Sequence, residues 1–330
     1  MNTYIGHTSQ LYGVEEHRLV GGKGDGMRLF QVNNGKGLAF TVSADRCADI
    51  SRLSFKGMNM GYFSPCGYVS PAFYDGVGAG FLKSFTAGFL TTCGLNGVGS
   101  PCTDAGEDLP LHGTIGNTPA EQIYWTEETD GLHIHAVIKD EGIFSHKLVL
   151  KREIICSLEV NEIIIKDKVV NTGDTEYPAM LLYHMNMGYP LLSEKAKLYI
   201  PSENVTPRNE HAAAGLDSWH IVEKPQAQYE EQCFFHHFDK EGIAAIFNPD
   251  INIGLAITFD AQSLSYFTEW KMMGERDYVM GLEPGNCHPD GRDRMREEGK
   301  LVILQPDESV TYQVKITMLD GTEAFEQLQK

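Results

Sequence analysis

Many short β-like runs follow one another along this 330-residue chain, and turn-forming residues divide them. The run 132–138 alternates between apolar and polar side chains, as a strand with one buried face does. The runs 147–156 and 162–170 follow, and both are rich in Ile and Val. Asp130-Gly131 and Asn171-Thr-Gly173 separate these runs and favour turns. The spacing therefore predicts a sandwich or barrel of strands and not a series of βαβ units.

Similar runs extend over most of the chain, while helical signals are few. The further β-like runs are 27–32, 38–43, 122–126, 179–187, 197–200, 232–238, 243–247, 254–259, 263–270, 278–283, 301–304 and 310–319. Only 73–85 and 290–298 suggest short helical segments. The 34 Gly and 14 Pro residues fit a turn-rich chain. We expect an all-β fold: one large antiparallel β-sandwich domain spanning residues 1–330, since no linker divides the chain.

One segment, 63–116, breaks this regular succession. It is rich in Gly and Pro and has weak periodicity. Its glycines match neither a dinucleotide-binding nor a P-loop pattern, so a phosphate site is not indicated. Long irregular segments in compact domains are usually functional. We therefore expect an irregular loop segment here that forms the wall of a pocket.

Charge and cysteine content limit the partners and the compartment. The 27 basic and 45 acidic residues give a net charge of −18, which disfavours nucleic acid and anionic lipid as partners. No apolar run is long enough for a membrane span, and the N-terminus does not resemble a signal peptide. The seven cysteines form no C-x-x-C pair, which indicates reduced thiols. We expect a cytoplasmic protein that is a monomer or a homodimer.

Two polar residues interrupt the apolar run 179–188. If this run is a strand, His184 and Asn186 share one face. Burying two polar side chains costs several kcal/mol unless they are paired or used. The sequence leaves two interpretations open, a satisfied buried network or a histidine at the floor of a pocket.

Other polar residues allow a functional and a structural interpretation alike. His112 ends the loop Leu109-Pro-Leu-His-Gly113, where a histidine can point inward or simply bond a carbonyl. Glu283 ends an apolar strand, where partial burial would raise its pKa towards the range of a general base. Arg46 beside Asp49 suggests a local salt bridge, and Lys271 a surface cation. His133 and His135 lie on the polar face of their run, where we expect solvent.

Taken in order, these motifs resemble the aldose 1-epimerase (galactose mutarotase-like) superfamily. The similarity lies in Asp45-Arg-x-x-Asp-Ile50, Leu109-Pro-Leu-His-Gly113, Tyr183-His-Met-Asn-Met-Gly-Tyr-Pro190 and Gly281-Leu-Glu-Pro-Gly-Asn286. Within that superfamily they are most similar to a bacterial branch of largely unassigned function. The resemblance spans roughly residues 25–318 and implies a large antiparallel β-sandwich that acts on a small-molecule sugar without a cofactor or metal.

The resemblance also implies roles for individual residues. His184 matches the general acid that protonates the ring oxygen, and Glu283 the base that deprotonates the anomeric hydroxyl. His112 matches a histidine that binds substrate and helps to polarise the ring oxygen. Glu231 falls near a sugar-binding aspartate, and Asn186 is expected to contact substrate.

The chain departs from the family at two positions. Tyr183 stands where the family has an asparagine, and 85–92 contains no counterpart of the family's substrate-binding arginine. Arg46 or Lys271 is expected to replace that arginine.

Three functions follow from these residues. The first is a cofactor-independent sugar isomerase of the aldose 1-epimerase type. The second is a metal-dependent sugar isomerase or lyase, since His112, His184 and Glu283 together are the residue types of a facial metal triad. The third is a non-catalytic carbohydrate-binding protein that uses aromatic platforms.

Overall fold

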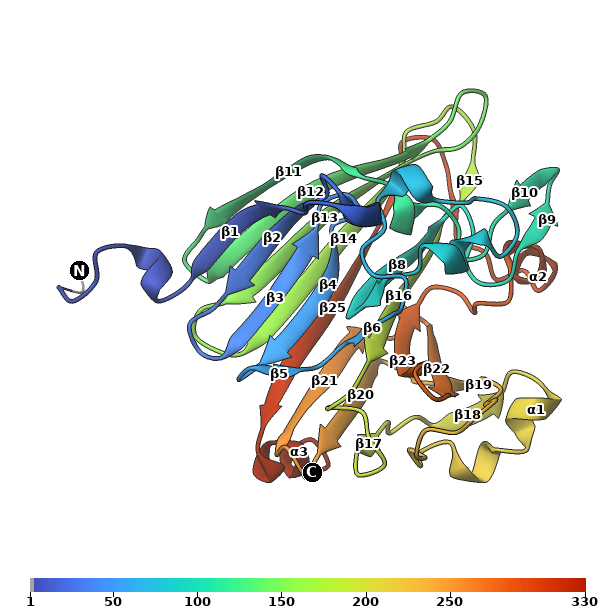
Figure 1. Ribbon diagram of the computed structural model, residues 1–330. Coiled ribbons are helices and arrows are strands. Elements are labelled where there is room, and N and C mark those ends of the chain that lie inside the picture. Colours follow the sequence, from blue (N-terminus) through green and yellow to red (C-terminus); the bar gives the residue numbers. More distant parts are fainter. Residues whose placement is uncertain (1–2) are drawn as a thin grey trace.

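Antiparallel strands dominate the computed structural model, which describes residues 3–330 (Figure 1). Three large sheets contain five, eight and six strands, and three two-stranded ribbons connect to them. Within residues 3–330 there are three α-helices, none longer than six residues. No helix in this range is long and apolar enough to cross a membrane. The predicted all-β sandwich class is confirmed.

The sheets have the following strands in spatial order. The five-stranded sheet contains β1 (Gly13–Arg18), β2 (Arg28–Asn33), β3 (Leu38–Ser43), β4 (Asp49–Phe55) and β5 (Met58–Asn59). The eight-stranded sheet contains β11 (Ala120–Glu127), β12 (Gly131–Glu141), β13 (Lys147–Ser157), β14 (Glu162–Asn171), β25 (Ser309–Asp320), β21 (Ile253–Asp260), β20 (Glu241–Asn248) and β17 (Lys197–Tyr199). The six-stranded sheet contains β18 (Asn204–Pro207), β19 (Gln232–His237), β22 (Tyr266–Met273), β23 (Tyr278–Gly285), β16 (Met180–Met187) and β8 (Leu90–Leu95).

The remaining elements are short. The ribbons are β6 (Tyr62–Phe63) with β7 (Ala87–Gly88), β9 (Cys102–Asp104) with β10 (Glu107–Leu109), and β15 (Tyr177–Pro178) with β24 (Ile303–Leu304). The helices are α1 (Glu210–Ala213), α2 (Arg292–Glu297) and α3 (Thr322–Gln327), and single 3-10 turns occur at Thr8–Gln10, Gly22–Gly24, Pro71–Phe73, Gly80–Lys83, Ile115–Asn117 and Leu216–Ser218.

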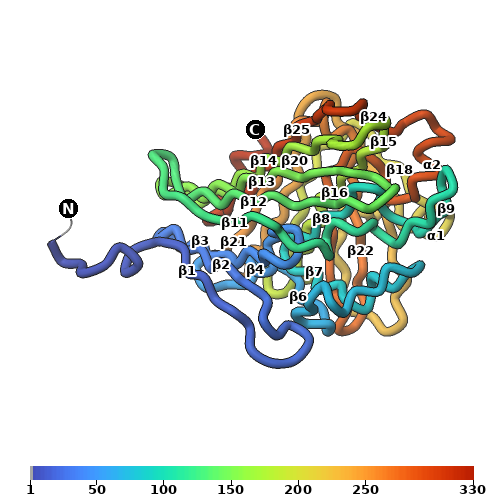
Figure 2. Tube along the Cα trace, turned by 90° about the horizontal axis from the view of Figure 1, so that it is seen from above, coloured from blue at the N-terminus to red at the C-terminus, as the bar shows by residue number. Residues whose placement is uncertain are grey.

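Two layers of strands enclose the main core. Seen from above, β1–β4 form one layer and β11–β14 the other (Figure 2). One continuous apolar cluster contains Phe30 from β2, Ile134 from β12 and Leu282 from β23. All three large sheets therefore contribute a face to the same core.

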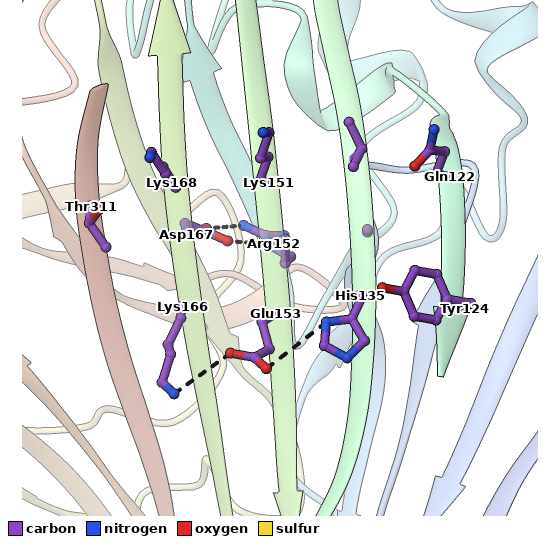
Figure 3. Close-up of a pocket in the computed structure, with 12 residues that line it drawn as sticks. Gln122, Tyr124, His135, Lys151, Arg152, Glu153, Lys166, Asp167, Lys168 and Thr311 are labelled. Atoms are coloured by element: carbon purple, nitrogen blue, oxygen red, sulfur yellow. Dashed lines mark hydrogen bonds and ion pairs between the residues drawn. The ribbon is translucent and has the colours of Figure 1, made fainter. Parts of the chain in front are cut away.

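The eight-stranded sheet shows the alternation expected of a half-buried sheet. Ile134 and Ile154 face the core, while Lys151, Glu153 and Lys166 lie on the outer face (Figure 3). The predicted runs 132–138, 147–156 and 162–170 become β12, β13 and β14 with ends shifted by three residues at most. Period-two hydrophobic patterning thus identified the largest sheet.

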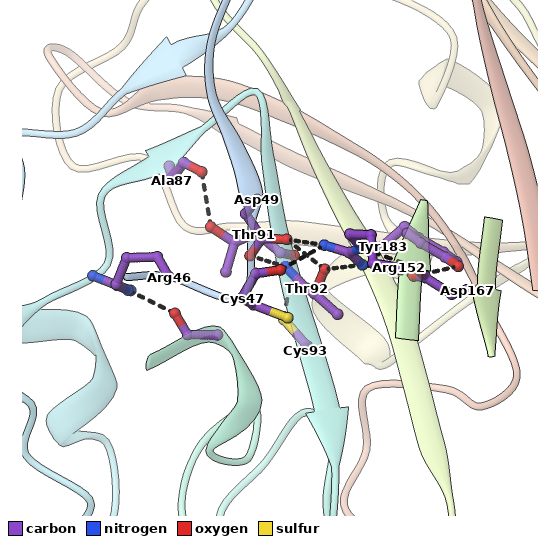
Figure 4. A network of polar contacts seen from close by, with 11 residues as sticks. Arg46, Cys47, Asp49, Ala87, Thr91, Thr92, Cys93, Arg152, Asp167 and Tyr183 are labelled. Atoms are coloured by element: carbon purple, nitrogen blue, oxygen red, sulfur yellow. Dashed lines mark hydrogen bonds and ion pairs between the residues drawn. The ribbon is translucent and has the colours of Figure 1, made fainter. Parts of the chain in front are cut away.

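A buried arginine connects the sheets at the centre of the molecule (Figure 4). Arg152 on β13 donates two hydrogen bonds to Asp167 on β14, at 2.9 and 2.6 Å. It also donates to Oδ1 of Asp49 on β4 at 2.7 Å and to Oγ1 of Thr92 on β8 at 2.8 Å. The Tyr183 hydroxyl on β16 donates to Asp167 at 2.9 Å. One guanidinium therefore links strands of all three large sheets. Asp49 pairs with Arg152, so the expected local salt bridge with Arg46 is wrong.

The segment 63–116 is less irregular than expected. It contains β8, the edge strand that pairs with β16, besides short ribbons and 3-10 turns. All six residues of β8 are buried, although Thr91, Thr92 and Gly94 make it look like a loop in sequence. Arg46 connects three parts of this segment, because its guanidinium donates hydrogen bonds to the carbonyls of Gly116, Val69 and Ser84 at 2.6–3.0 Å.

The central arginine gives the first prediction. Arg152→Met leaves two buried carboxylates without their cation, so we expect the free energy of unfolding to fall by about 3–5 kcal/mol. Urea denaturation followed by circular dichroism measures this change. Lys151→Met, at the exposed neighbouring position, is the matched control and should change the free energy by about 0.5 kcal/mol or less. Equal effects of the two substitutions would contradict the structural role of Arg152.

Candidate active site

Four polar side chains occupy one row across the six-stranded sheet. His184 on β16 pairs with Thr91 on β8, and Glu283 on β23 pairs with Thr268 on β22. The β16–β23 register, in which Leu182 is opposite Gly285, places His184 opposite Glu283. Neighbouring residues on β16, such as Tyr183, point into the core instead. The strand alternation therefore directs this row away from the core.

His184 and Glu283 form a close buried pair. Nε2 of His184 lies 3.3 Å from Oε1 of Glu283, and both side chains are at least 94% buried. Nδ1 of His184 and Oε1 of Glu283 have no hydrogen-bond partner in the structure. Buried polar groups are normally satisfied, and those that are not call for an explanation. Both groups are available to bond a ligand.

Burial shifts the two pKa values in opposite directions. It lowers the pKa of His184 to about 4, although the Asn186 side chain acts the other way. It raises the pKa of Glu283 well above its ordinary value, and the Glu231 carboxylate adds to this effect while Arg208 opposes it. Both shifts favour the uncharged forms, a neutral imidazole and a protonated carboxyl group, in this buried pair.

Gly281 makes room for the Glu283 carboxylate. A Cβ atom at position 281 would lie 2.1 Å from Oε1 of Glu283 and 3.1 Å from Cβ of Trp270. The carboxylate thus lies over the glycine backbone on the same face of β23, two residues away. Any larger side chain at 281 would displace it.

His112, which belongs to the segment 63–116, lies beside His184. Its backbone has φ 60°, a conformation that non-glycine residues rarely adopt and that clusters at functional sites. Its N–H donates to the Gly99 carbonyl at 2.9 Å, and its own carbonyl accepts from Gly94 at 3.1 Å. The ring centroids of His112 and His184 are 5.5 Å apart. Burial, reinforced by His184 and Arg208, lowers the pKa of His112 well below its usual range.

These three residues line a cavity of about 350 Å³. Aromatic rings pack edge-on around His184, with ring centroids 5.2 Å away at Trp270 and 5.4 Å away at Phe85. The volume is at the small end of the range for small-molecule sites, and the mixture of rings and convergent polar groups is typical of them.

Two charged residues form the polar side of this cavity. Glu231 accepts a 2.7 Å hydrogen bond from Nε1 of Trp270, which fixes the indole. Arg208, directly after β18, donates to Asp290 at 2.9 Å and to Ser100 at 3.1 Å. Sequence reasoning missed Arg208. An isolated arginine at the end of a strand, in a chain with an excess of acidic residues, could have indicated it. The family resemblance directed attention to the segment before His112 instead.

Three expected substrate contacts lie elsewhere. Arg46 and Lys271 do not line the cavity. Lys271 is buried on the other side of β22, where its ammonium lies 2.8 Å from the carbonyl of Ile221 and 3.0 Å from Glu223. Asn186 is fully buried and donates to the His184 carbonyl at 2.9 Å, so it supports the strand beside His184 and does not face the cavity.

The geometry does not favour a facial metal triad here. His112, His184 and Glu283 do not bring three donor atoms within 4.8 Å of one another. Among residues 3–330, only Glu128, His133 and His135 form a group of that kind, and they lie at the β11–β12 hairpin of the eight-stranded sheet.

The chain matches one family model, described as "Domain of unknown function (DUF4432)", over residues 24–318. No curated protein matches it in sequence.

Several solved structures share its fold. A candidate aldose 1-epimerase from Klebsiella pneumoniae superposes with a TM-score of 0.90 at 26% identity, covering 98% of this chain and 88% of that one. A galactose mutarotase-like protein from Clostridium acetobutylicum gives a TM-score of 0.68 at 15% identity, with 94% and 99% of the chains covered. Galactose 1-epimerase from Lactobacillus acidophilus gives 0.66 at 12% identity, with 94% and 99% covered. The galactose mutarotase-like fold is thereby shown.

The depressed pKa of His184 gives the second prediction. We expect its imidazole to remain neutral from pH 7 down to about pH 4, because burial disfavours the imidazolium. The unfolded chain takes up this proton near the ordinary value of 6.5, so this group makes the folded state lose stability as the pH falls from 6.5 towards 4. Ring ¹⁵N NMR, with His184→Asn to assign the signal, measures the midpoint. A midpoint at 6.5 or above would contradict the buried, neutral assignment.

Proposed function

The chain belongs to the DUF4432 family, and we propose that it is a sugar isomerase of the aldose 1-epimerase type. The observation that supports this most directly is the buried pair of His184 and Glu283, 3.3 Å apart at the floor of a cavity. A proton donor and a proton acceptor side by side suit a reaction that moves one proton onto a substrate and another off it.

The proposed reaction interconverts the two anomers of a free sugar. The base removes the proton of the anomeric hydroxyl, the acid protonates the ring oxygen, and the bond between that oxygen and the anomeric carbon breaks. The resulting aldehyde rotates, and the reverse transfers close the ring as the other anomer. Protons and electrons balance within the substrate and the pair.

The protonation state of the pair is consistent with this sequence. One proton moved from Glu283 to His184 across their 3.3 Å separation gives a carboxylate base and an imidazolium acid. That state contains the same number of protons as the resting one, so no proton has to enter from solvent. Hydroxyl groups of a bound sugar would stabilise the carboxylate by hydrogen bonding and favour the transfer.

The surrounding residues suit a neutral or weakly charged sugar. Trp270 and Phe85 offer apolar faces, while Nδ1 of His112 and Oγ1 of Thr268 are buried without partners and can bond hydroxyls. The charge of Arg208 is already balanced by Asp290 at 2.9 Å, so it is better suited to orient a hydroxyl than to neutralise a strong anion.

The third prediction tests the pair. His184→Asn and Glu283→Gln each remove one proton-transfer group, so we expect anomer exchange to slow by about 10²–10⁴-fold. Exchange NMR over a panel of hexoses, pentoses and acidic sugars measures it. His237→Asn, an exposed histidine outside the cavity, is the control and should retain full activity. If no sugar shows protein-dependent exchange that both active-site variants reduce, the proposed function fails.

The fourth prediction concerns the glycine beneath the carboxylate. Gly281→Ala should leave the fold intact, because the atoms closest to the added Cβ are the carboxyl end of the Glu283 side chain, yet it displaces that carboxylate from its position near His184. Displacements of about 1 Å in an active site can cost about 10²-fold in rate, so we expect a loss of this order at unchanged melting temperature.

Gly6→Ala is the matched control for this substitution. The nearest atom to its added Cβ would be 3.8 Å away, an ordinary contact, and the residue is remote from the cavity. Full activity of Gly281→Ala would show that the position of the carboxylate is not critical.

A further inference from the structure

A second cluster of titratable side chains lies on the outer face of the eight-stranded sheet, at the hairpin that joins β11 and β12. His133 and His135 are two residues apart on β12 and so point to the same face. Glu128 follows the end of β11, and Glu153 lies on the neighbouring strand β13. The two imidazole rings are stacked, with centroids 6.0 Å apart. Sequence reasoning expected His133 to be solvated, but it is 97% buried.

The donor atoms of this cluster converge. One donor atom each from Glu128, His133 and His135 lies within 4.8 Å of the other two. Nε2 of His135 is 3.9 Å from Oε1 of Glu128. Oε1 of Glu153 is 2.9 Å from Nδ1 of His133 and 4.0 Å from Nδ1 of His135. Glu128, His133 and His135 therefore converge, and Glu153 on β13 contacts both imidazoles at their Nδ1 atoms.

The cluster creates a strongly negative environment around His133. Its two ring nitrogens contact carboxylates, Glu153 at 2.9 Å and Asp130 at 2.8 Å. Burial alone would lower the pKa of His133, yet the bonds to these carboxylates raise it overall. Lys166 lies 3.6 Å from Glu153 on this side of the sheet. The carboxylates of Asp130 and Glu153 against the ring nitrogens of His133 give this part of the sheet a negative charge that attracts a cation.

The cluster opens onto a groove. A cavity of about 390 Å³ on this face is lined by His135, Glu153 and Lys166, with Tyr124 stacked on His135 at 4.9 Å (Figure 3). The groove reaches the cluster at His135 and Glu153, the two members that line it.

We propose that Glu128, His133 and His135, with Glu153 beside them, form a binding site for a divalent transition metal of the Zn²⁺ class. Two imidazoles and a carboxylate are the ligand types that suit Zn²⁺, whereas Mg²⁺ and Ca²⁺ prefer oxygen ligands. Zinc bonds of about 2.0–2.2 Å require the donor atoms to move closer than in the empty site. Glu128 can make most of this movement, since its side chain is 48% exposed.

The test uses the full chain, freed of metal with a chelator and titrated with Zn²⁺ in a calorimeter. The expected result is one equivalent bound, with a rise in melting temperature, and no binding of Mg²⁺. His135→Ala and Glu128→Gln should each weaken the affinity at least tenfold. His135 and Glu128 are 26% and 48% exposed, so both variants are expected to fold, which circular dichroism verifies.

His237→Ala is the matched control, because His237 is also a strand histidine beside a glutamate, Glu203, at 3.9 Å. It should bind Zn²⁺ within twofold of the unaltered protein. His184→Asn should do the same, which separates this site from the cavity on the six-stranded sheet. Two results would overturn the proposal: no Zn²⁺ binding by the unaltered protein, or an affinity that His135→Ala and Glu128→Gln both leave unchanged.

Discussion

The relative placement of the three large sheets depends on the buried guanidinium of Arg152. Its bonds to Asp167, Asp49 and Thr92 join strands from the three large sheets. A buried ion pair of this kind adds little net stability compared with apolar side chains, but removing one partner is costly. Its main effect here is to fix how the sheets meet. Since Tyr183 bonds the same Asp167 and immediately precedes His184, the arrangement of the core also determines where the cavity-facing side of β16 lies.

Local patterns in the sequence were sufficient for much of the fold and for the centre of the site. Alternation of apolar and polar residues identified β12, and the same rule placed His184 on a face with Leu182. The polar residues His184 and Glu283 stood out because apolar neighbours surround each of them. Such signals are carried by a few neighbouring residues, and a single strand is enough to display them.

What the sequence could not reveal depends on contacts between distant segments. The partner of Asp49 is Arg152, 103 residues away, so proximity in sequence wrongly suggested Arg46. β8 was missed because its two threonines and its glycine are not hydrophobic, and only the packing of other segments buries them. Arg208 reaches the cavity only through the packing of β18 beside β19. In each case tertiary structure determines the environment of a residue whose local sequence is ordinary.

Central strands form the floor of the cavity, whereas connecting segments form part of its walls. Substitutions in these two parts have different consequences. His184, Glu283 and Gly281 belong to central strands whose other face is the core, so changes there disturb folding and chemistry together. Ser100, Arg208 and Glu231 lie outside the strands, in connecting segments. Substitutions in these connections can change the walls of the cavity while the strands that carry His184 and Glu283 are preserved. Relatives of this chain can thus share the floor of the cavity and differ in the shape and charge of its walls.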